Sequence, residues 1–332
     1  MTTVSRGDGD PVLELLYGWQ PARVLMVAFE LGVFRHLGRR RLTAAALGPR
    51  AGLHPIAAAR LLDACAATGL LHKSGNRYWN TLAARESLLP SSPWYLGDVV
   101  AVAAGLWEQW GHLAEALRAY PKRGRPRRVP DVAREYVLAN QARARRVGPQ
   151  LAQALDLRGR RSLLDLGCGP GTHAELLARR RPGLKVTLLD LPPVLAVAKR
   201  ALAASPARRR LRFLARDARR DPLGSGYDVA LLSAVLHTLG EQDCRRLLAK
   251  VYRALAPGGQ VAILEELAQD EGTWPPQAAI FSLQMLLSGS AGRAYGAAEL
   301  EGWLRECGFA QVASRLLPPP AETGLVTGIK PP

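Results

Sequence analysis

Three glycines at alternate positions follow a short apolar run and precede a segment with helical spacing. The run is Leu163–Leu166, the glycines are Gly167, Gly169 and Gly171, and the helical segment begins at Thr172. Glycine can turn the backbone through positive φ and lets a ligand approach without a Cβ in the way. The N-terminus of the following helix offers free N–H groups and the positive end of its dipole. The stretch therefore predicts a strand, a tight turn that cradles a cofactor, and a helix, in the first crossover of an open α/β sheet.

The spacing of these glycines distinguishes between cofactors. The dinucleotide fingerprint is G-x-G-x-x-G, whereas here the third glycine comes one residue early and Asp165 stands two residues before the first. This pattern resembles motif I, D-x-G-x-G-x-G, of the class I S-adenosylmethionine-dependent methyltransferases. S-adenosylmethionine has no pyrophosphate and carries a sulfonium and an ammonium group, which an acid beside the glycine turn suits. A plain glycine turn that joins a strand to a helix is the alternative.

After the glycine turn, apolar runs alternate with segments of helical spacing. Strands are predicted at residues 185–190, 208–214, 227–233, 260–266, 310–316 and 324–329, with a tight turn at 257–259. Helices are predicted at residues 194–204, 241–255, 277–287 and 297–307. This alternation predicts a Rossmann-like α/β fold with a doubly wound, mostly parallel sheet. The methyltransferase resemblance implies that the last strand is antiparallel.

Ligands of such sheets bind at the carboxyl ends of the strands. Asp190 ends a buried strand about twenty residues after the glycine turn, where a carboxylate can bond both ribose hydroxyls. The resemblance implies that Asp217 and Ala218 contact the adenine. The predicted binding residues for S-adenosylmethionine are Asp165, Gly167, Gly169, Gly171, Asp190, Leu191, Asp217, Ala218 and Ser233.

The N-terminal region predicts a small, mainly helical domain. Helix is expected over residues 12–37, broken near Gly18 and Pro21, then from an N-cap at Thr43, and again from Pro55. Ser74-Gly75-Asn76, between two extended pieces, is a hairpin signal. This is the winged-helix pattern, which in isolation suggests DNA binding. The helix from Pro55 is rich in alanine, however, and lacks the cluster of Arg, Asn and Gln side chains that suits base edges.

The same region resembles the N-terminal dimerisation domain of small-molecule O-methyltransferases. The residues that carry the resemblance are Ala28–Phe34 and Arg60–Leu62. It implies a homodimer. Helix is also expected over residues 94–120 and 131–157, on either side of an exposed, arginine-rich linker at 121–130. The expected organisation is a winged-helix dimerisation domain at 11–100, connecting helices at 101–157 and a catalytic domain at 158–332.

A second motif suggests the chemistry. Val235–Leu239, with the following Cys244, matches the segment that carries the catalytic histidine in caffeate- and acetylserotonin-type O-methyltransferases. Leu264–Glu266 matches the strand carrying a glutamate that orients this histidine. Neutral imidazole can take the proton of a phenol near pH 7, and a third group can fix its tautomer. The resemblance thus implies His237 as general base and Glu265 as its orienting partner, with no metal; the alternative is that His237 merely caps the next helix.

The chain departs from this family at one position near the expected site. The family's second glutamate, in a G-[KR]-E-R-T segment, aligns with Ala294, and His237 is followed by Thr-Leu instead of Asp-Trp. The acceptor could therefore be an easily deprotonated phenol, or a nitrogen or carbon atom. If the missing acid limits the base, Ala294→Glu should raise activity toward a poorly acidic phenol.

Composition leaves two other functions to weigh. Lys+Arg 45 against Asp+Glu 28 gives a net charge of +17, which permits nucleic-acid binding but also fits a solvated, arginine-rich surface. Against a nucleic-acid methyltransferase, Ser233–Leu236 stands where amino-methylating enzymes usually carry an N-P-P-Y-type tetrad. A non-catalytic, cofactor-binding regulator is the other alternative.

Scattered cysteines, a polar N-terminus and the lack of a long apolar run predict a cytoplasmic protein without membrane or nucleic-acid partners. The favoured function is methyl transfer from S-adenosylmethionine to a hydroxyl of a small aromatic acceptor.

Overall fold

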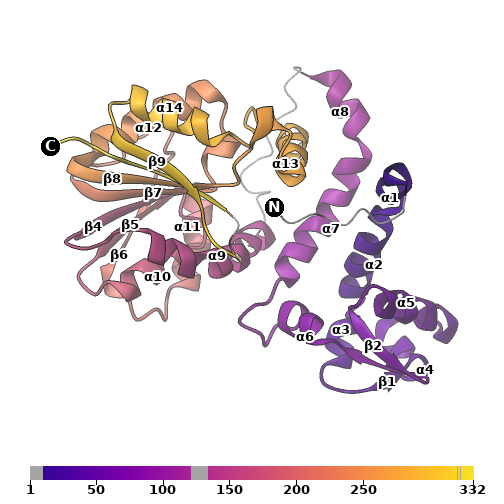
Figure 1. Ribbon diagram of the computed structural model, residues 1–332. Coiled ribbons are helices and arrows are strands. Elements are labelled where there is room, and N and C mark those ends of the chain that lie inside the picture. The colour runs from indigo at the N-terminus through magenta and orange to yellow at the C-terminus, as the bar shows by residue number, and fades with distance from the viewer. Residues whose placement is uncertain (1–9, 121–133, 320, 322) are drawn as a thin grey trace. The chain divides into compact units, whose positions relative to one another are not determined.

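The computed structural model describes residues 10–120, 134–319, 321 and 323–332 (Figure 1). The chain divides into two compact units, residues 1–108 and 109–332, and helix α7 (Gly97–Gly111) passes from the first into the second. The arginine-rich linker predicted at 121–130 lies outside the described residues, as does the start of the helix predicted at 131–157.

The first unit contains short helices and a small antiparallel sheet. Its three strands, in the order β1-β3-β2, are β1 (Leu42–Thr43), β2 (Leu71–Ser74) and β3 (Arg77–Asn80). Its helices before α7 are α1 (Pro11–Tyr17), α2 (Trp19–Glu30), α3 (Val33–Leu37), α4 (Ala44–Leu47), α5 (Pro55–Ala67) and α6 (Leu82–Leu88). Phe34, Leu37, Leu62 and Cys65 lie in its core, which gives the unit an apolar interior of its own.

Local sequence signals explain most of these boundaries. The Thr43 hydroxyl accepts a hydrogen bond from the N–H of Ala46 and caps α4, as predicted. The expected hairpin forms between β2 and β3. The break predicted near Gly18 is confirmed, because α1 ends at Tyr17 and α2 begins at Trp19. Pro21 itself does not break the helix, because it lies in the first turn of α2, where a missing N–H costs no helical bond. The chain breaks again after α2, at Gly32, whose φ is 68°.

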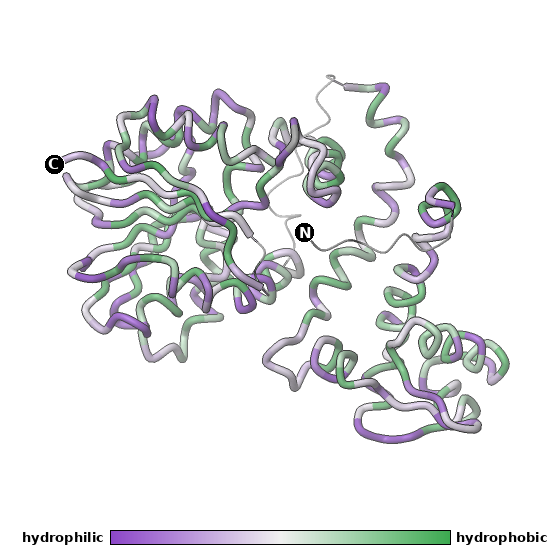
Figure 2. The backbone as a smooth tube through the Cα atoms, viewed as in Figure 1, coloured by the Kyte–Doolittle hydropathy of each residue, from purple (hydrophilic) through white to green (hydrophobic). Residues whose placement is uncertain are grey.

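The second unit is built on a seven-stranded sheet in the order β6-β5-β4-β7-β8-β10-β9. The strands are β4 (Ser162–Leu166), β5 (Lys185–Asp190), β6 (Leu211–Ala215), β7 (Tyr227–Ser233), β8 (Leu255–Glu265), β9 (Ala310–Leu316) and β10 (Gly324–Ile329). The last strand, β10, runs antiparallel to both of its neighbours, whereas the strands from β6 to β8 are parallel. Figure 2 shows hydrophobic stretches along the central strands, as expected where a sheet is buried on both faces.

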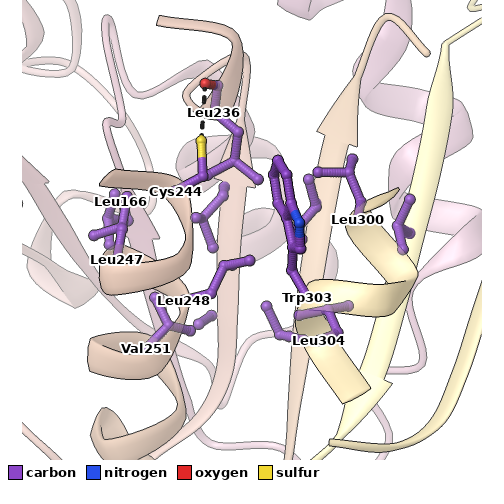
Figure 3. Close-up of a cluster of buried hydrophobic side chains, with 14 of the residues drawn as sticks. Leu166, Leu236, Cys244, Leu247, Leu248, Val251, Leu300, Trp303 and Leu304 are labelled. Carbon is purple, nitrogen blue, oxygen red and sulfur yellow. Dashed lines mark hydrogen bonds between the residues drawn. The ribbon is translucent and has the colours of Figure 1, made fainter. Parts of the chain in front are cut away.

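Helices cover the two faces of this sheet, and each face has its own apolar cluster. One cluster contains Leu151, Leu177 and Leu195, from three helices. The other contains Leu247, Leu248 and Trp303, and Figure 3 shows part of it. The helices of this unit are α8 (Leu113–Ala119), α9 (Arg134–Ala154), α10 (Thr172–Arg180), α11 (Pro192–Ala201), α12 (Glu241–Ala254), α13 (Pro276–Leu287) and α14 (Ala297–Glu306). The predicted α/β class, with a doubly wound and mostly parallel sheet, is confirmed.

Two predicted boundaries in this unit are wrong. Arg208–Arg210 forms a 3-10 turn, η3, before β6 begins, and the guanidinium of Arg210 donates to the carbonyls at the end of α10. Residues 257–259 lie within β8, which begins at Leu255, and the pairing of β7 with β8 shifts register there. Proline cannot donate to the ladder and Gly258 has a φ of 72°, so the irregularity sits where the sequence predicted a turn. Among the described residues, no helix has both the length and the apolar character needed to cross a membrane.

Candidate active site at the carboxyl edge of the sheet

The glycine turn lies at the carboxyl edge of the sheet, between β4 and α10. Its three glycines have φ values of 68°, 53° and 77°, which side chains rarely tolerate. A Cβ at Gly167 would also lie 2.6 Å from the Val235 side chain. A Cβ at Gly169 would meet no atom within 4 Å. The middle of the turn therefore faces open space, as a loop that receives a ligand requires.

Asp190, at the end of β5, holds this turn. Its carboxylate accepts hydrogen bonds from the N–H groups of Gly169 at 2.9 Å and Leu191 at 2.7 Å. Burial raises the pKa of this carboxyl group, and the two N–H donors oppose that shift. A carboxylate has about four lone-pair positions, so two backbone donors leave room for further donors, such as the hydroxyls of a ribose.

Asp165 is buried beneath the turn with only 1% of its surface exposed. Its Oδ2 has no hydrogen-bond partner among the described residues, and the same holds for Oγ1 of Thr172 and Nδ1 of His173. Burial raises the pKa of Asp165 to about 7, and the Asp190 carboxylate adds to the shift. Buried polar atoms are nearly always paired, so the unpaired oxygen of Asp165 beside the glycine turn is suited to an external ligand. Carboxylates that lack a cation fit the ammonium and sulfonium of S-adenosylmethionine.

Three of the other predicted binding residues lie at or just after the carboxyl ends of β7 and β6. Ser233 ends β7, and it pairs in register with Leu264, the residue before Glu265. Ala218 is half-buried, and its carbonyl accepts a hydrogen bond from Lys250. The carboxylate of Asp217 forms an ion pair with Arg219 at 2.8 Å, which holds the pKa of Asp217 below its usual range. Its side chain is thus engaged within the protein.

His237 and Glu265 form a buried pair at this edge. His237 lies in the 3-10 turn η4 (Leu236–Thr238) after β7, and Glu265 is the last residue of β8. Nδ1 of His237 lies 2.7 Å from Oε2 of Glu265, and the two residues are 8% and 4% exposed. The other carboxylate oxygen, Oε1, accepts the N–H groups of Val235 and Leu236. An ionised carboxylate can only accept, so the proton of the neutral ring lies on Nδ1 and Nε2 is left as a proton acceptor.

The histidine ring also has an aromatic neighbour. The ring of Phe281, from α13, meets it edge-on with the centroids 4.8 Å apart. Phe281 packs in turn on a cluster of three buried alanines, Ala268, Ala278 and Ala294. Ala294 is 2% exposed, so the position at which the family pattern carries a glutamate is filled here by a methyl group in an apolar setting. Glu265 is the acid that contacts the ring.

Comparisons with known proteins identify the family. A family model described as an O-methyltransferase domain matches residues 124–310, and one described as an O-methyltransferase dimerisation domain matches residues 13–89. The 3-hydroxy-5-methyl-1-naphthoate 3-O-methyltransferase of Streptomyces sahachiroi is 35% identical, over 96% of this chain and 94% of its own. The chain belongs to the S-adenosylmethionine-dependent O-methyltransferase family. The predicted class of enzyme, its methyl donor and the family resemblance are thereby confirmed.

Other members of this family support the assignment. The tetracenomycin polyketide synthesis 8-O-methyl transferase of Streptomyces glaucescens is 34% identical, over 92% of this chain and 93% of its own. The crystal structure of human N-acetylserotonin methyltransferase in complex with SAM matches the whole of both chains, with a TM-score of 0.86 and 25% identity. Similarity thus extends over both units of this O-methyltransferase.

Sequence reasoning missed several residues that surround the His237 turn. Phe281, from α13, contacts the imidazole directly. Ser290 and Tyr295 donate hydrogen bonds to carbonyls of the turn, at Thr238 and Leu239. No local signal identifies such contacts, because a single serine or tyrosine between a helix and a helix is an ordinary loop residue.

Proposed function

We propose that this O-methyltransferase transfers a methyl group from S-adenosylmethionine to a hydroxyl of a small aromatic acceptor, with His237 as general base. The observation that carries the proposal is the buried contact between Nδ1 of His237 and Glu265, which leaves Nε2 free to take a proton. A phenol is a poor nucleophile until it loses its proton, and positioned acid–base groups typically contribute 10²–10⁴-fold to the rate. S-adenosylmethionine would supply the activated methyl group.

The chain's own residues would perform three tasks. Glu265 fixes the tautomer of His237 and stabilises the imidazolium once the proton has moved. The ring of Phe281 restricts the imidazole and offers an apolar surface to an aromatic acceptor. For the methyl donor, the proposed binding residues are those of the glycine turn with Asp165, Asp190, Leu191, Asp217, Ala218 and Ser233. The unpaired oxygen of Asp165 is available to its cationic groups, and the lone pairs of Asp190 to its hydroxyls.

The acceptor proposal draws on the relatives. The name of the naphthoate enzyme specifies a hydroxyl on a fused aromatic ring, and the other relatives' names specify a tetracenomycin polyketide and acetylserotonin. The contact of His237 with the Phe281 ring and with a single carboxylate suits a flat aromatic acceptor whose hydroxyl is already fairly acidic. N- or C-methylation of a small molecule is the second possibility, because the site's basic group would serve those acceptors as well.

The decisive experiment is methyl transfer from radiolabelled S-adenosylmethionine to a panel that contains 3-hydroxy-5-methyl-1-naphthoate, N-acetylserotonin and simple phenols. Product analysis by NMR shows whether the methyl group is on oxygen, nitrogen or carbon. His237→Gln should lower kcat by about 10²–10⁴-fold and leave the affinity for S-adenosylmethionine unchanged. Full activity of that variant would rule out His237 as base. Tight donor binding without turnover of any compound would favour a non-catalytic regulator, and methylation of RNA or DNA would indicate the nucleic-acid alternative.

We also propose that the enzyme is a cytoplasmic homodimer that assembles through its N-terminal helices. The dimerisation model covers residues 13–89. Helix α1 and the start of α2 expose large apolar side chains within the first unit: Val12, Leu13, Leu15, Leu16, Tyr17 and Trp19, each at least half exposed. A continuous apolar surface of this kind is typical of a protein interface. The domain boundaries proposed are 11–100, 101–157 and 158–332.

A further inference from the structure

The turn that carries His237 is held from outside by hydrogen bonds to its backbone. The carbonyl of Leu236 accepts from Sγ of Cys244 at 3.4 Å, as Figure 3 shows. The carbonyl of Thr238 accepts from the Ser290 hydroxyl at 2.9 Å, and that of Leu239 accepts from the Tyr295 hydroxyl at 2.5 Å. Three carbonyl groups among residues 236–239 thus accept hydrogen bonds from side chains of other segments, in addition to the N–H groups that bind Glu265.

Tyr295 makes the most buried of these contacts through an oxygen donor. It is 3% exposed, and its ring meets Trp303 edge-on at 4.9 Å. The guanidinium of Arg293 lies over the same ring, 4.6 Å from its centre. A ring fixed on both sides cannot turn its hydroxyl elsewhere, and a hydrogen bond in such a dry setting is strong. The Leu239 carbonyl is therefore tied to the rigid core beneath α14.

The segment around Tyr295 also packs directly on the histidine's own backbone. A Cβ at Gly292 would collide with the carbonyl of His237, so no side chain fits between the two segments. The same segment brings Ala294 into the apolar cluster that supports Phe281, whose ring packs in a T-shaped contact with the imidazole. The loop of residues 290–295 thus contacts the backbone of the His237 turn and also supports Phe281, which contacts the imidazole.

We propose that Tyr295 is a positioning residue for methyl transfer, whose hydroxyl fixes the His237 turn so that the imidazole stays on Glu265 with Nε2 in one place. The inference rests on the proposed role of His237 as base. Where the family pattern has a second acid at 294, this chain has alanine, and Glu265 is the acid that contacts the ring. Orientation of the ring then depends on the backbone that carries it. A displacement of about 1 Å at a reacting group can cost as much as 10²-fold in rate, so a loosened turn should be visible in kcat.

The test compares two tyrosines that lose the same kind of hydrogen bond. Tyr295→Phe removes the bond to Leu239, and Tyr227→Phe removes a bond from a buried tyrosine to the carbonyl of Leu223. Tyr227 begins β7 and Ser233 ends it, so the control lies about 20 Å from the site. We expect Tyr295→Phe to lower kcat on the order of tenfold, with the dissociation constant of S-adenosylmethionine unchanged. Tyr227→Phe should change kcat by less than about twofold while losing a similar amount of thermal stability.

A second readout does not depend on the acceptor. In protein labelled with ¹⁵N-histidine, the Nδ1–H signal of His237, identified by its loss in His237→Gln, should broaden or shift in Tyr295→Phe and stay unchanged in Tyr227→Phe. In a His237→Gln background, Tyr295→Phe should cause no further loss of rate, because it acts through the ring. The inference is overturned if Tyr295→Phe keeps full kcat and an unchanged Nδ1–H signal, or if both tyrosine variants lower kcat equally. It is also overturned if Tyr295→Phe still lowers the rate in the His237→Gln background. High activity of His237→Gln would instead overturn the proposed base, and the spectrum would still report on the turn.

Discussion

Because Asp165 is buried, we predict that an ionised carboxylate at the binding site for the methyl donor lowers the stability of the folded enzyme. Burial and the neighbouring Asp190 raise the pKa of this carboxyl from 3.8 to about 7 in the folded protein. The folded state therefore holds a proton that the unfolded state has released, over the range between these two values. Burial of Asp165 therefore costs the folded state nothing below about pH 4, and it lowers the free energy of unfolding as the pH rises to 7.

The size of the effect follows from the shift. About three pKa units, at 1.36 kcal/mol each, give about 4 kcal/mol above pH 7, of which roughly 2 to 3 kcal/mol is lost between pH 5 and 8. Asp165→Asn keeps the shape and the acceptor for the N–H of Ala174 but cannot ionise. Its buried amide lacks a partner for its donors, which costs about 1 to 3 kcal/mol. Without ligand, the variant should thus be more stable than the wild type at pH 8, by about 1 to 3 kcal/mol.

The contribution of His173 to stability has the opposite pH dependence, so it must be distinguished from that of Asp165. Burial lowers its pKa from 6.5 to about 4, so the unfolded state binds the extra proton and stability is lost as the pH falls from 6.5 to 4. The two contributions partly cancel in the wild type below pH 6.5. The difference between variant and wild type removes the contribution of His173, because that residue is common to both proteins.

The assay is urea unfolding of the ligand-free proteins from pH 5 to pH 8.5, with Asp243→Asn as control. Asp243 lies on α12 of the same unit, with 47% of its side chain exposed beside Arg246, and its replacement should change little. The advantage of Asp165→Asn over the wild type should grow with pH, whereas the control should run parallel to the wild type. S-adenosylmethionine should stabilise the wild type more than Asp165→Asn, because a bound cation favours the charged carboxylate. A pH-independent difference, or a variant less stable than the wild type at pH 8, would refute the reasoning.

Other variants test the remaining parts of the site. Asp190→Ala should weaken S-adenosylmethionine binding by about 1.5 to 3 kcal/mol in calorimetry, because it removes charged acceptors and the support of Gly169; unchanged affinity would exclude Asp190 from that role. Glu265→Gln should retain the fold in circular dichroism and lower kcat by less than His237→Gln does, since an amide can still accept from Nδ1. From the sequence alone, Ala294→Glu was expected to raise activity if the missing acid limits the base. We now expect it to lower the thermal midpoint without raising kcat, because Ala294 is 2% exposed among apolar side chains. A more active variant of unchanged stability would contradict this. Leu15→Lys, at a position 83% exposed on α1, should shift the protein toward monomer in light scattering, and a wild type that is already monomeric would exclude the proposed dimer.

Features that depend on local spacing could be predicted from the amino-acid sequence alone. The acid and glycines from 165 to 171 predicted a strand, a turn and a helix, because positive φ and an apolar run are properties of short segments. Alternation of apolar runs with helical periods predicted the doubly wound sheet for the same reason. The strand start predicted at Arg208 was wrong, because residues 208–210 form a 3-10 turn before the strand begins.

Features that depend on packing between distant segments emerge only in the folded molecule. The contact of His237 with Glu265 spans 28 positions, and that of Tyr295 with Leu239 spans 56. The sequence could propose the first through a family resemblance, but it had no signal for the second. The raised pKa of Asp165 and the apolar setting of Ala294 depend likewise on desolvation, which is set by everything packed around a group. Burial is a property of the assembled fold, and for that reason only the structure could reverse the expected effect of Ala294→Glu.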